Sequence, residues 1–464
     1  DFDTVDIPFS PEQVKKMTRR ALALFIVALA IPLLGGASPA DAQSADPALT
    51  LEQAIAVAVE QNHQLGVADA VVSHAAASTD EAKASMYPHV ELWETFMRTT
   101  NPVYVFGNKL GQASFTMEDF QLDALNSPDP YNNWNTRFSV TQPVWTGGRI
   151  SRHVEAAEHG QDAAAQQRKR TRQEVIHQVV EAYTGAVVAD RHLMVAEESL
   201  KTAQAHVALV ETMRNAGLVV ESDVLQARLR ESEVAEMVIR ANTAIAISHA
   251  AVNRTMRGDL DTPFILPETI DVPAVPEESL DQLIAEAMMS RPDLGGAGSQ
   301  LAAAGKMVDA ARAEYWPTIG FAGSFEMNDK DFIGAEGTNW TLVGALQWSI
   351  FDHARSARVR QRTAQQLQAE RSIKLLEQHI SLQVREAFLE RGAAEQRLEQ
   401  ARRSMELAEE SMRIIENRYR EGLTTLIELL DAETALTQAR TRAISAGRDL
   451  LLSQATLDLA IGRK

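Results

Sequence analysis

The chain has 464 residues, a formal net charge of −18 and no cysteine. The acidic balance argues against a nucleic-acid partner, because phosphate backbones bind basic surfaces. The missing thiols exclude disulfides, thiolate metal ligands, cysteine nucleophiles and a cysteine-linked lipid anchor.

Residues 1–42 have the pattern of an export signal. A basic stretch at 15–20 precedes an apolar run at 21–36, and the small-residue motif Ala40-Asp41-Ala42 follows it. This order predicts upstream residues and a signal peptide that is cleaved after Ala42, with translation starting at Met17. The apolar run is also shorter than the roughly 20 residues that a membrane-spanning helix needs.

The remainder of the chain repeats one plan. Each copy contains a helix, an aromatic-rich hairpin and two long helical segments that meet at a Gly-Leu turn. We place the first repeat at 43–257, an inter-repeat linker at 258–279 and the second repeat at 280–464. A duplication of this length predicts a pseudo-symmetric molecule.

The two hairpins are expected at about 88–145 and about 317–351. Within them, four segments alternate apolar residues with small or polar ones, namely 90–96, 135–142, 318–325 and 340–348. Alternation with a period of two predicts strands, and an apolar face opposite a polar face suits lipid on one side and water on the other. A soluble sandwich with an aromatic core is the alternative.

Tryptophans lie where these strands are expected to end. Membrane-interface girdles place indole rings half among headgroups and half in hydrocarbon. The candidate interface residues are Trp134, Trp145, Trp340 and Trp348. A spanning barrel needs at least about eight strands, so several copies of the chain are expected to share one. The long connection at 101–133 in the first hairpin is expected to be a cell-surface loop, with part of it folded over the mouth as an open alternative.

Two pairs of long helices are expected, at about 148–215 and 222–257 and at about 353–421 and 424–461. Proline is absent from both regions, and each first helix of about 67 residues would be roughly 100 Å long. Glycine suits the left-handed position that ends a helix, so the tips are assigned to Gly217, Leu218, Gly422 and Leu423. A coiled-coil hairpin in a scaffold protein would show the same pattern.

Several segments together resemble the outer-membrane efflux proteins of the TolC channel-tunnel family. They are LEQAIAVAVEQN at 51–62, Tyr87-Pro88 and Trp316-Pro317 before strands, QPVWTGGR at 142–149, and the tip segments NAGLVVESDVLQA and NRYREGLTTLIELLDAETAL. The resemblance covers nearly everything from Leu49 to Gly462. It rests on the order and duplication of the segments, because none of them is decisive alone.

This resemblance implies a mainly α fold with a small β part, organised as two internal repeats. It implies a homotrimer that forms a 12-stranded outer-membrane β-barrel, continued into the periplasm by an α-helical barrel. The expected partners are outer-membrane lipid, a periplasmic adaptor (membrane-fusion) protein and an inner-membrane pump of the RND or ABC type. The expected location is the outer membrane of a Gram-negative bacterium.

The resemblance also assigns residues at the tips. Glu428 and Asp431 match an acidic ring that lines the periplasmic gate, and their spacing places them on one helix face. Tyr419 and Asp223 match a hydrogen-bonded pair that ties the gate shut. Thr424 stands where some family members carry an arginine, so a second, ionic tie is not expected. Two exposed acids at a helix N-terminus, favoured by the helix dipole, are the alternative explanation for the acidic pair.

No enzyme motif survives inspection. The glycines before Lys306 suggest a phosphate loop, but Gln300 and Met307 occupy positions where the loop needs glycine and a hydroxyl. We expect no enzyme activity, no cofactor and no bound metal. The sequence favours a passive exit duct of a tripartite efflux pump or a type I secretion system, for small toxic molecules, metal ions or polypeptides. An exported periplasmic coiled-coil scaffold or adaptor without a pore is the alternative.

Overall fold

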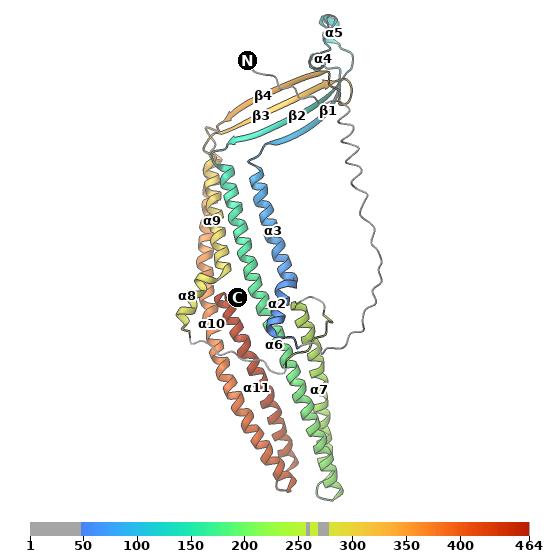
Figure 1. Ribbon diagram of the computed structural model, residues 1–464, viewed down its shortest axis with the longest axis vertical. Helices are drawn as coiled ribbons and strands as arrows, with labels where there is room; N and C mark the ends of the chain where they lie inside the picture. The colour runs from blue at the N-terminus through green and yellow to red at the C-terminus, as the bar shows by residue number, and fades with distance from the viewer. Residues whose placement is uncertain (1–47, 257–259, 268–277, 464) are drawn as a thin grey trace, which may run out of the picture. The chain divides into compact units, whose positions relative to one another are not determined.

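The computed structural model describes residues 48–256, 260–267 and 278–463. These residues form long helices and one small antiparallel sheet (Figure 1), as expected from the sequence. The expected signal peptide and residues 258–259 and 268–277 of the expected linker lie outside the described residues. Among those that are described, no helix is both long enough and apolar enough to cross a membrane.

The described elements of the two halves follow the same order, except that α4, η1 and α5 occur only in the first half. The first half contains α2 (Leu51–Gln61), α3 (His63–Ala84), β1 (His89–Thr99), α4 (Pro102–Gly111), η1 (Met117–Phe120), α5 (Leu122–Asn126), β2 (Tyr131–Trp145), α6 (Arg149–Asn215) and α7 (Glu221–Met256). The second half contains α8 (Leu280–Ser290), α9 (Pro292–Ala313), β3 (Thr318–Asp329), β4 (Gly337–Gln347), α10 (His353–Arg420) and α11 (Leu426–Ile461). Helices α2 and α8 have 11 residues each, α3 and α9 have 22, and α7 and α11 have 36.

The single helix expected before each hairpin is in fact two helices. In the first half, Asn62 has an extended backbone and its side chain accepts a hydrogen bond from the Gln64 amide, which caps α3. In the second half, Arg291 is extended because the following Pro292 disfavours the helical region for the residue before it. A capping box at Thr50 and another at Ser279 start the shorter helices α2 and α8.

The four strands form one antiparallel sheet in the order β1-β2-β3-β4. Register pairs Leu92 with Phe138, Phe138 with Phe325, and Phe325 with Trp340, so one row of residues crosses all four strands. Strands β1 and β4 each have one unpaired edge. Helices α3, α6, α9 and α10 all adjoin the same end of this sheet, where β1 and β3 begin and β2 and β4 end (Figure 1).

Two hydrophobic clusters hold the short helices against the long ones. In the first, Ala54 and Ala58 of α2 pack on Val175, Val179 and Tyr183 of α6, and the Tyr183 hydroxyl donates to the Leu49 carbonyl at 2.7 Å. In the second, the corresponding helix α8 packs on α10 and α11. The core therefore consists of packed interfaces between helices in each half, and not of a single central core.

The connection between β1 and β2, expected to be a surface loop with part of it folded over the mouth, contains regular elements of its own. It contains α4, η1 and α5, and Asn101 caps α4 through its side chain. Edge-to-face ring contacts join Phe106 to Phe115 and Phe115 to Phe120. An aromatic cluster and a capped helix give this segment a small core of its own.

Candidate functional site

The sheet has two chemically different faces. Large apolar side chains lie on one face and are solvent-exposed in the isolated chain, namely Val90, Leu92, Phe96, Phe138, Val140, Phe321, Phe325, Trp340, Leu342 and Leu346. Glu94 also lies on this face, where the Thr136 hydroxyl donates to it. The exposed apolar patch is far too extensive for a protein surface in contact only with water.

The opposite face of the sheet is polar and hollowed. A groove of about 420 Å³ on this face is lined by Glu91, Arg137, Ser139, Ser324 and Thr341 among others. Arg137 Nε lies 2.9 Å from Glu326 Oε1 across neighbouring strands. Trp93 also faces this side, which explains why the sequence of β1 alternates poorly. The sheet thus has one apolar and one polar face.

The four candidate interface tryptophans lie at two levels of the sheet. Trp145 ends β2 and Trp348 directly follows β4, so both lie at the end that adjoins the helices. Trp134 and Trp340 instead lie three residues inside their strands, in the distal half of the sheet. Trp134 packs between the rings of Phe96 and Phe332, with centroid separations of 4.6 and 5.0 Å.

At the other end of the long helices, two hairpins meet in one hydrophobic cluster. The cluster contains Val207 and Val210 of α6, Val224 and Ala227 of α7, Met412 and Tyr419 of α10, and Leu426, Leu429 and Ala432 of α11. This packing joins the tip of the first half to the tip of the second. The tips therefore behave as one structural unit within a chain.

Each hairpin turns at a glycine in the left-handed conformation. Gly217 and Gly422 both have φ of +73°. The next residue, Leu218 or Leu423, donates its amide to the carbonyl five residues earlier, at 2.9 and 2.8 Å, which is the Schellman arrangement. The two leucines are 71% and 62% exposed. Both turns thus present an apolar side chain to solvent on a rigid backbone.

The acidic pair lies beside the second of these turns. Glu428 is in the first turn of α11, and its amide donates to the side chain of the N-cap residue Thr425. Its carboxylate accepts a hydrogen bond from the Thr424 hydroxyl. Both Glu428 and Asp431 are exposed, whereas Leu429 between them is buried. The two carboxylates are therefore free to face a shared axis in an assembly.

The expected hydrogen bond between Tyr419 and Asp223 is not formed. Tyr419 is 4% exposed, and among the described residues its hydroxyl has no hydrogen-bond partner. Burial raises the pKa of Tyr419, and the nearby Asp223 carboxylate raises it further. The Tyr419 ring is instead buried in the apolar packing of the tip cluster. Its hydroxyl does not reach the Asp223 carboxylate.

A second group of polar residues is buried next to the tip cluster, on the side away from the turns. The sequence analysis missed it. Glu433 is 3% exposed, with His206 Nδ1 at 3.6 Å and Arg230 Nε at 3.9 Å from its carboxylate oxygens. Within the described part of the chain, these four nitrogen and oxygen atoms lack hydrogen-bond partners. The signal was present in the sequence, because Glu433 falls on the buried stripe that Leu426 and Leu429 define.

This cluster predicts a pH-dependent stability of the tip. Burial raises the pKa of Glu433 from its ordinary 4.5, and Arg230 only partly opposes the shift. The contribution of this carboxyl is therefore complete below about pH 4.5 and is lost as pH rises through the raised pKa. We expect Glu433→Gln to stabilise the tip at pH 8 by about 1–3 kcal/mol, with the gain vanishing near pH 4.

Hydrogen exchange of the α11 amides, corrected for the intrinsic rate at each pH, measures this effect. Burial lowers the pKa of His206, with opposing contributions from Glu416 and Arg420 of α10. Glu406→Gln, at an exposed position of α10, is the matched control. An equal gain at both pH values would show that the Glu433 charge is not the cause.

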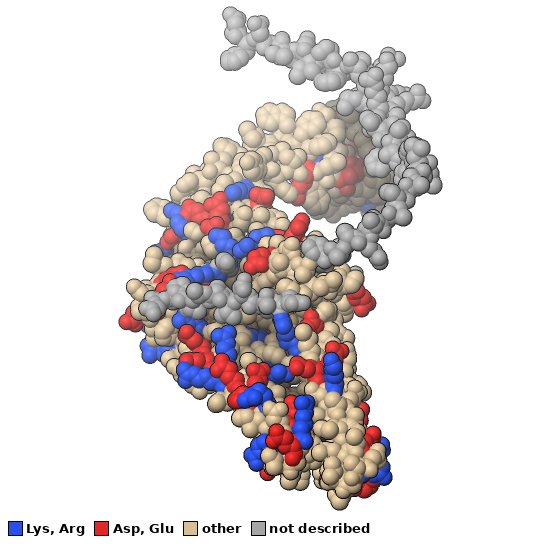
Figure 2. All heavy atoms as spheres, turned by 60° about the horizontal axis from the view of Figure 1, so that its bottom comes forward, with Lys and Arg blue, Asp and Glu red and all other residues tan. Residues whose placement is uncertain are grey.

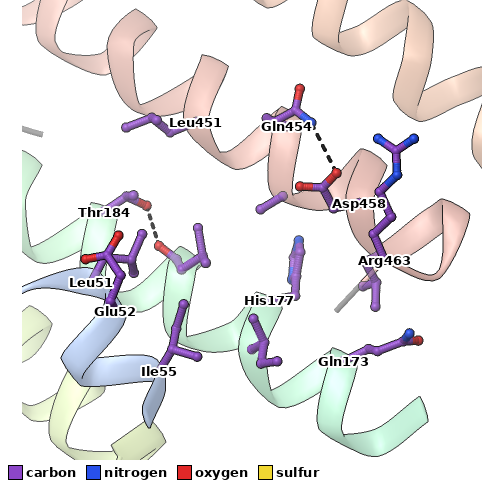
Figure 3. A pocket seen from close by; sticks show the side chains of 14 residues that line it. Leu51, Glu52, Ile55, Gln173, His177, Thr184, Leu451, Gln454, Asp458 and Arg463 are labelled. Carbon is purple, nitrogen blue, oxygen red and sulfur yellow. Dashed lines mark hydrogen bonds between the residues drawn. The ribbon is translucent and has the colours of Figure 1, made fainter. Parts of the chain in front are cut away.

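A pocket of about 430 Å³ lies between α2, α6 and α11 (Figure 3). Its walls are mainly apolar, with Leu51, Ile55 and Leu451 around it. His177 Nε2 lies 3.0 Å from the Thr456 hydroxyl, and burial lowers the pKa of His177. The pocket thus links the first short helix to the last long one.

Charged side chains are distributed unevenly over the molecule. Figure 2 shows Lys, Arg, Asp and Glu spread over the long helices and around the tips, whereas the visible part of the sheet is mostly uncharged. Within the described ranges, no group of three or more His, Asp or Glu side chains is placed to hold a metal ion. The features that remain are an amphipathic sheet, a helical hairpin pair and an acidic tip.

Comparisons with known proteins agree with this combination. The family model described as outer membrane efflux protein matches residues 54–256 and 283–463, and the chain belongs to that family. The pyoverdine export outer membrane protein OpmQ of Pseudomonas putida is 25% identical over 436 residues, covering 89% of this chain and 85% of OpmQ. The protein is thus an outer-membrane efflux protein of a Gram-negative bacterium, in a family of channels and not of enzymes.

Solved structures show the same fold. A crystal structure of CusC has a TM-score of 0.74 at 19% identity, covering 89% of this chain and 92% of CusC. The open-state structure of the MtrE outer membrane channel from Neisseria gonorrhoeae has a TM-score of 0.72 at 18% identity, covering 89% of each chain. Both similarities extend across the sheet and the long helices.

Proposed function

We propose that this chain forms a homotrimer that serves as the outer-membrane exit duct of an efflux pump. The observation that carries the proposal is the four-stranded sheet with unpaired edges at β1 and β4, apolar on one face and polar on the other. Three such sheets joined edge to edge would supply about twelve strands, enough to close a barrel with lipid outside and water inside. Trp134, Trp145, Trp340 and Trp348 would lie near its two lipid interfaces.

The outer surface of α10 supports assembly from several copies. Leu375, Leu382 and Leu389 recur every seven residues and are 69%, 50% and 62% exposed. They lie on the side of α10 away from Ile380, Val384 and Ala387, which pack on α8 and α11 of the same chain. A heptad stripe of exposed leucines is the pattern of a helix that packs against a second helix. We assign that second helix to a neighbouring copy, so that the helices form a closed tunnel.

The tips carry the remaining parts of the proposal. Glu428 and Asp431 of three copies would place six carboxylates around the axis and favour cations there. The exposed Leu218 and Leu423 beside Gly217 and Gly422 would dock a periplasmic adaptor, which connects the duct to an RND or ABC pump in the inner membrane. That pump would select the cargo, whether small toxic molecules, metal ions or polypeptides.

Planar lipid bilayers test the channel directly. We expect the purified, detergent-solubilised protein to insert as trimers and to produce discrete, uniform conductance steps. A protein that stays monomeric and soluble without detergent, and that produces no steps, would favour the alternative of an exported scaffold. The apolar sheet face counts against that alternative, because it would remain exposed to water.

A further inference from the structure

The segment between β1 and β2 covers the polar face of the sheet, not the apolar one. Asn108 of α4 lines a groove of about 340 Å³ on that face together with Trp93, Asn135 and Glu326. Its amide lies 3.8 Å from the sulfur of Met97, which has the same orientation in β1 as Trp93. Helix α4 therefore lies on the side of the sheet that would face the interior of the proposed channel.

A buried amide network pins α4 in this position. Gln112, which is 3% exposed, donates from Nε2 to the Asn132 carbonyl at 2.9 Å and to Asn133 Oδ1 at 2.8 Å. The Tyr131 hydroxyl donates to Gln112 Oε1 at 2.7 Å. Asn133 in turn donates to Asn328 Oδ1 on β3 at 3.0 Å. Buried side-chain networks whose groups are satisfied are rigid, so this anchor fixes the end of α4 to β2 and β3.

The opposite side of α4 is apolar and uncovered. Val105 is buried at 3% exposure, whereas Val103 and Leu110 are 77% and 52% exposed. Tyr104, one turn before Asn108, is 55% exposed on the flank of the helix. Positions 103, 107 and 110 share one helix face, and Gly107 between the two apolar residues keeps that face smooth. With the polar face of the sheet behind it, this apolar face points away from the sheet and toward the interior that the proposed barrel would enclose.

We propose that three copies of α4 meet around the channel axis and form an apolar constriction at the outer mouth. This inference rests on the proposed trimer, and the occupants of each exposed α4 face are the α4 helices of the two other copies. About twelve strands spaced by about 4.8 Å and tilted by about 40° enclose a circle roughly 24 Å across. Three helices, each about 10 Å wide with side chains, would fill most of that opening.

An apolar constriction affects transport because it disfavours water inside it. A narrow ring of Val103 and Leu110 side chains disfavours a continuous water column and so resists small hydrated ions. Amphipathic or apolar solutes are not disfavoured by such a ring, so they pass more readily. The outer mouth would thus select by polarity, in series with the acidic tip at the periplasmic end. Displacing α4 requires breaking the hydrogen bonds of Gln112.

Single cysteines test the placement, because the chain has none of its own. Leu110→Cys places a thiol on the proposed inner face, and Met117→Cys places one on η1, where Met117 is 82% exposed. We expect a bulky, impermeant thiol reagent added to the outer side to lower the single-channel conductance of Leu110→Cys by about half or more. The same labelling of Met117→Cys should leave the conductance unchanged. Equal conductance after complete labelling of Leu110→Cys would overturn the constriction while leaving the channel proposal intact.

Release of the anchor provides an independent test. Gln112→Ala removes three hydrogen bonds that hold α4 to the sheet. We expect its conductance to rise by about twofold or more, because α4 no longer stays over the mouth. Gln121→Ala, at an exposed position of the same segment, is the control and should conduct like the parent. A Gln112→Ala channel with parental conductance would contradict the proposal, and a parent without any conductance would overturn the proposed function itself.

Discussion

Leu382→Glu combined with Leu389→Glu should leave the protein unable to form a stable trimer. Both leucines lie on the exposed heptad stripe of α10, at 50% and 62% exposure. In the proposed assembly each would be buried against a neighbouring copy, where burial of one leucine contributes about 1.5–3 kcal/mol. A carboxylate there loses that contribution and adds the cost of desolvating a charge, six times per trimer. Sedimentation in detergent should show monomers in place of trimers.

A matched substitution separates assembly from folding. Ser372→Glu adds an acid at an exposed position of α10, about 80° around the helix from Leu382 at 100° per residue. This variant should sediment like the parent, and the circular dichroism of all the proteins should be equally helical. Trimers that persist in the double leucine variant would place the subunit interface on another surface.

Glu428→Gln combined with Asp431→Asn should remove most of the cation selectivity of the channel. The two positions are exposed on one side of α11, next to the Gly422 turn. Three copies would present six carboxylates at a narrow tip, and fields of this kind raise the local cation concentration about tenfold or more. The reversal potential in a salt gradient should move toward zero, and block by multivalent cations should weaken strongly.

The control for this experiment changes net charge by the same amount elsewhere. Glu197→Gln combined with Glu406→Gln removes two exposed acids per chain from α6 and α10. Its reversal potential should match that of the parent at physiological ionic strength, where the Debye length is only about 8 Å. If both double variants shift the potential equally, the selectivity comes from total charge and not from the tip.

The four strands and the long helices follow from local sequence patterns. The period-two alternation around Phe138, Phe325 and Trp340 was enough to assign one apolar face, and the structure places these three residues in one row across the sheet. The proline-free runs were enough to predict helices of this length, and the tip glycines Gly217 and Gly422 have the expected left-handed backbone. These features depend on neighbours a few residues apart, so propensity and spacing decide them.

The breaks and the loop were harder to predict. Asn62 and Arg291 split each expected helix in two, although the Arg291-Pro292 pair carried a recognisable signal. The loop at 101–133 has few regular periods, yet it folds around an aromatic cluster of its own. Short helices of this kind are set mainly by tertiary packing, because an isolated helix of 10 residues such as α4 is marginal in water.

By itself, the sequence of this protein determined the order of its elements, the two faces of its sheet, its export signal pattern and its family resemblance. Only the tertiary structure decided that Glu433 is buried beside His206 and Arg230, that the Tyr419 hydroxyl does not reach Asp223, and that Gln112 pins α4 over the polar face. Each of these contacts joins residues from different helices or strands. Their distances depend on how long helices and strands pack against one another, which no local pattern encodes.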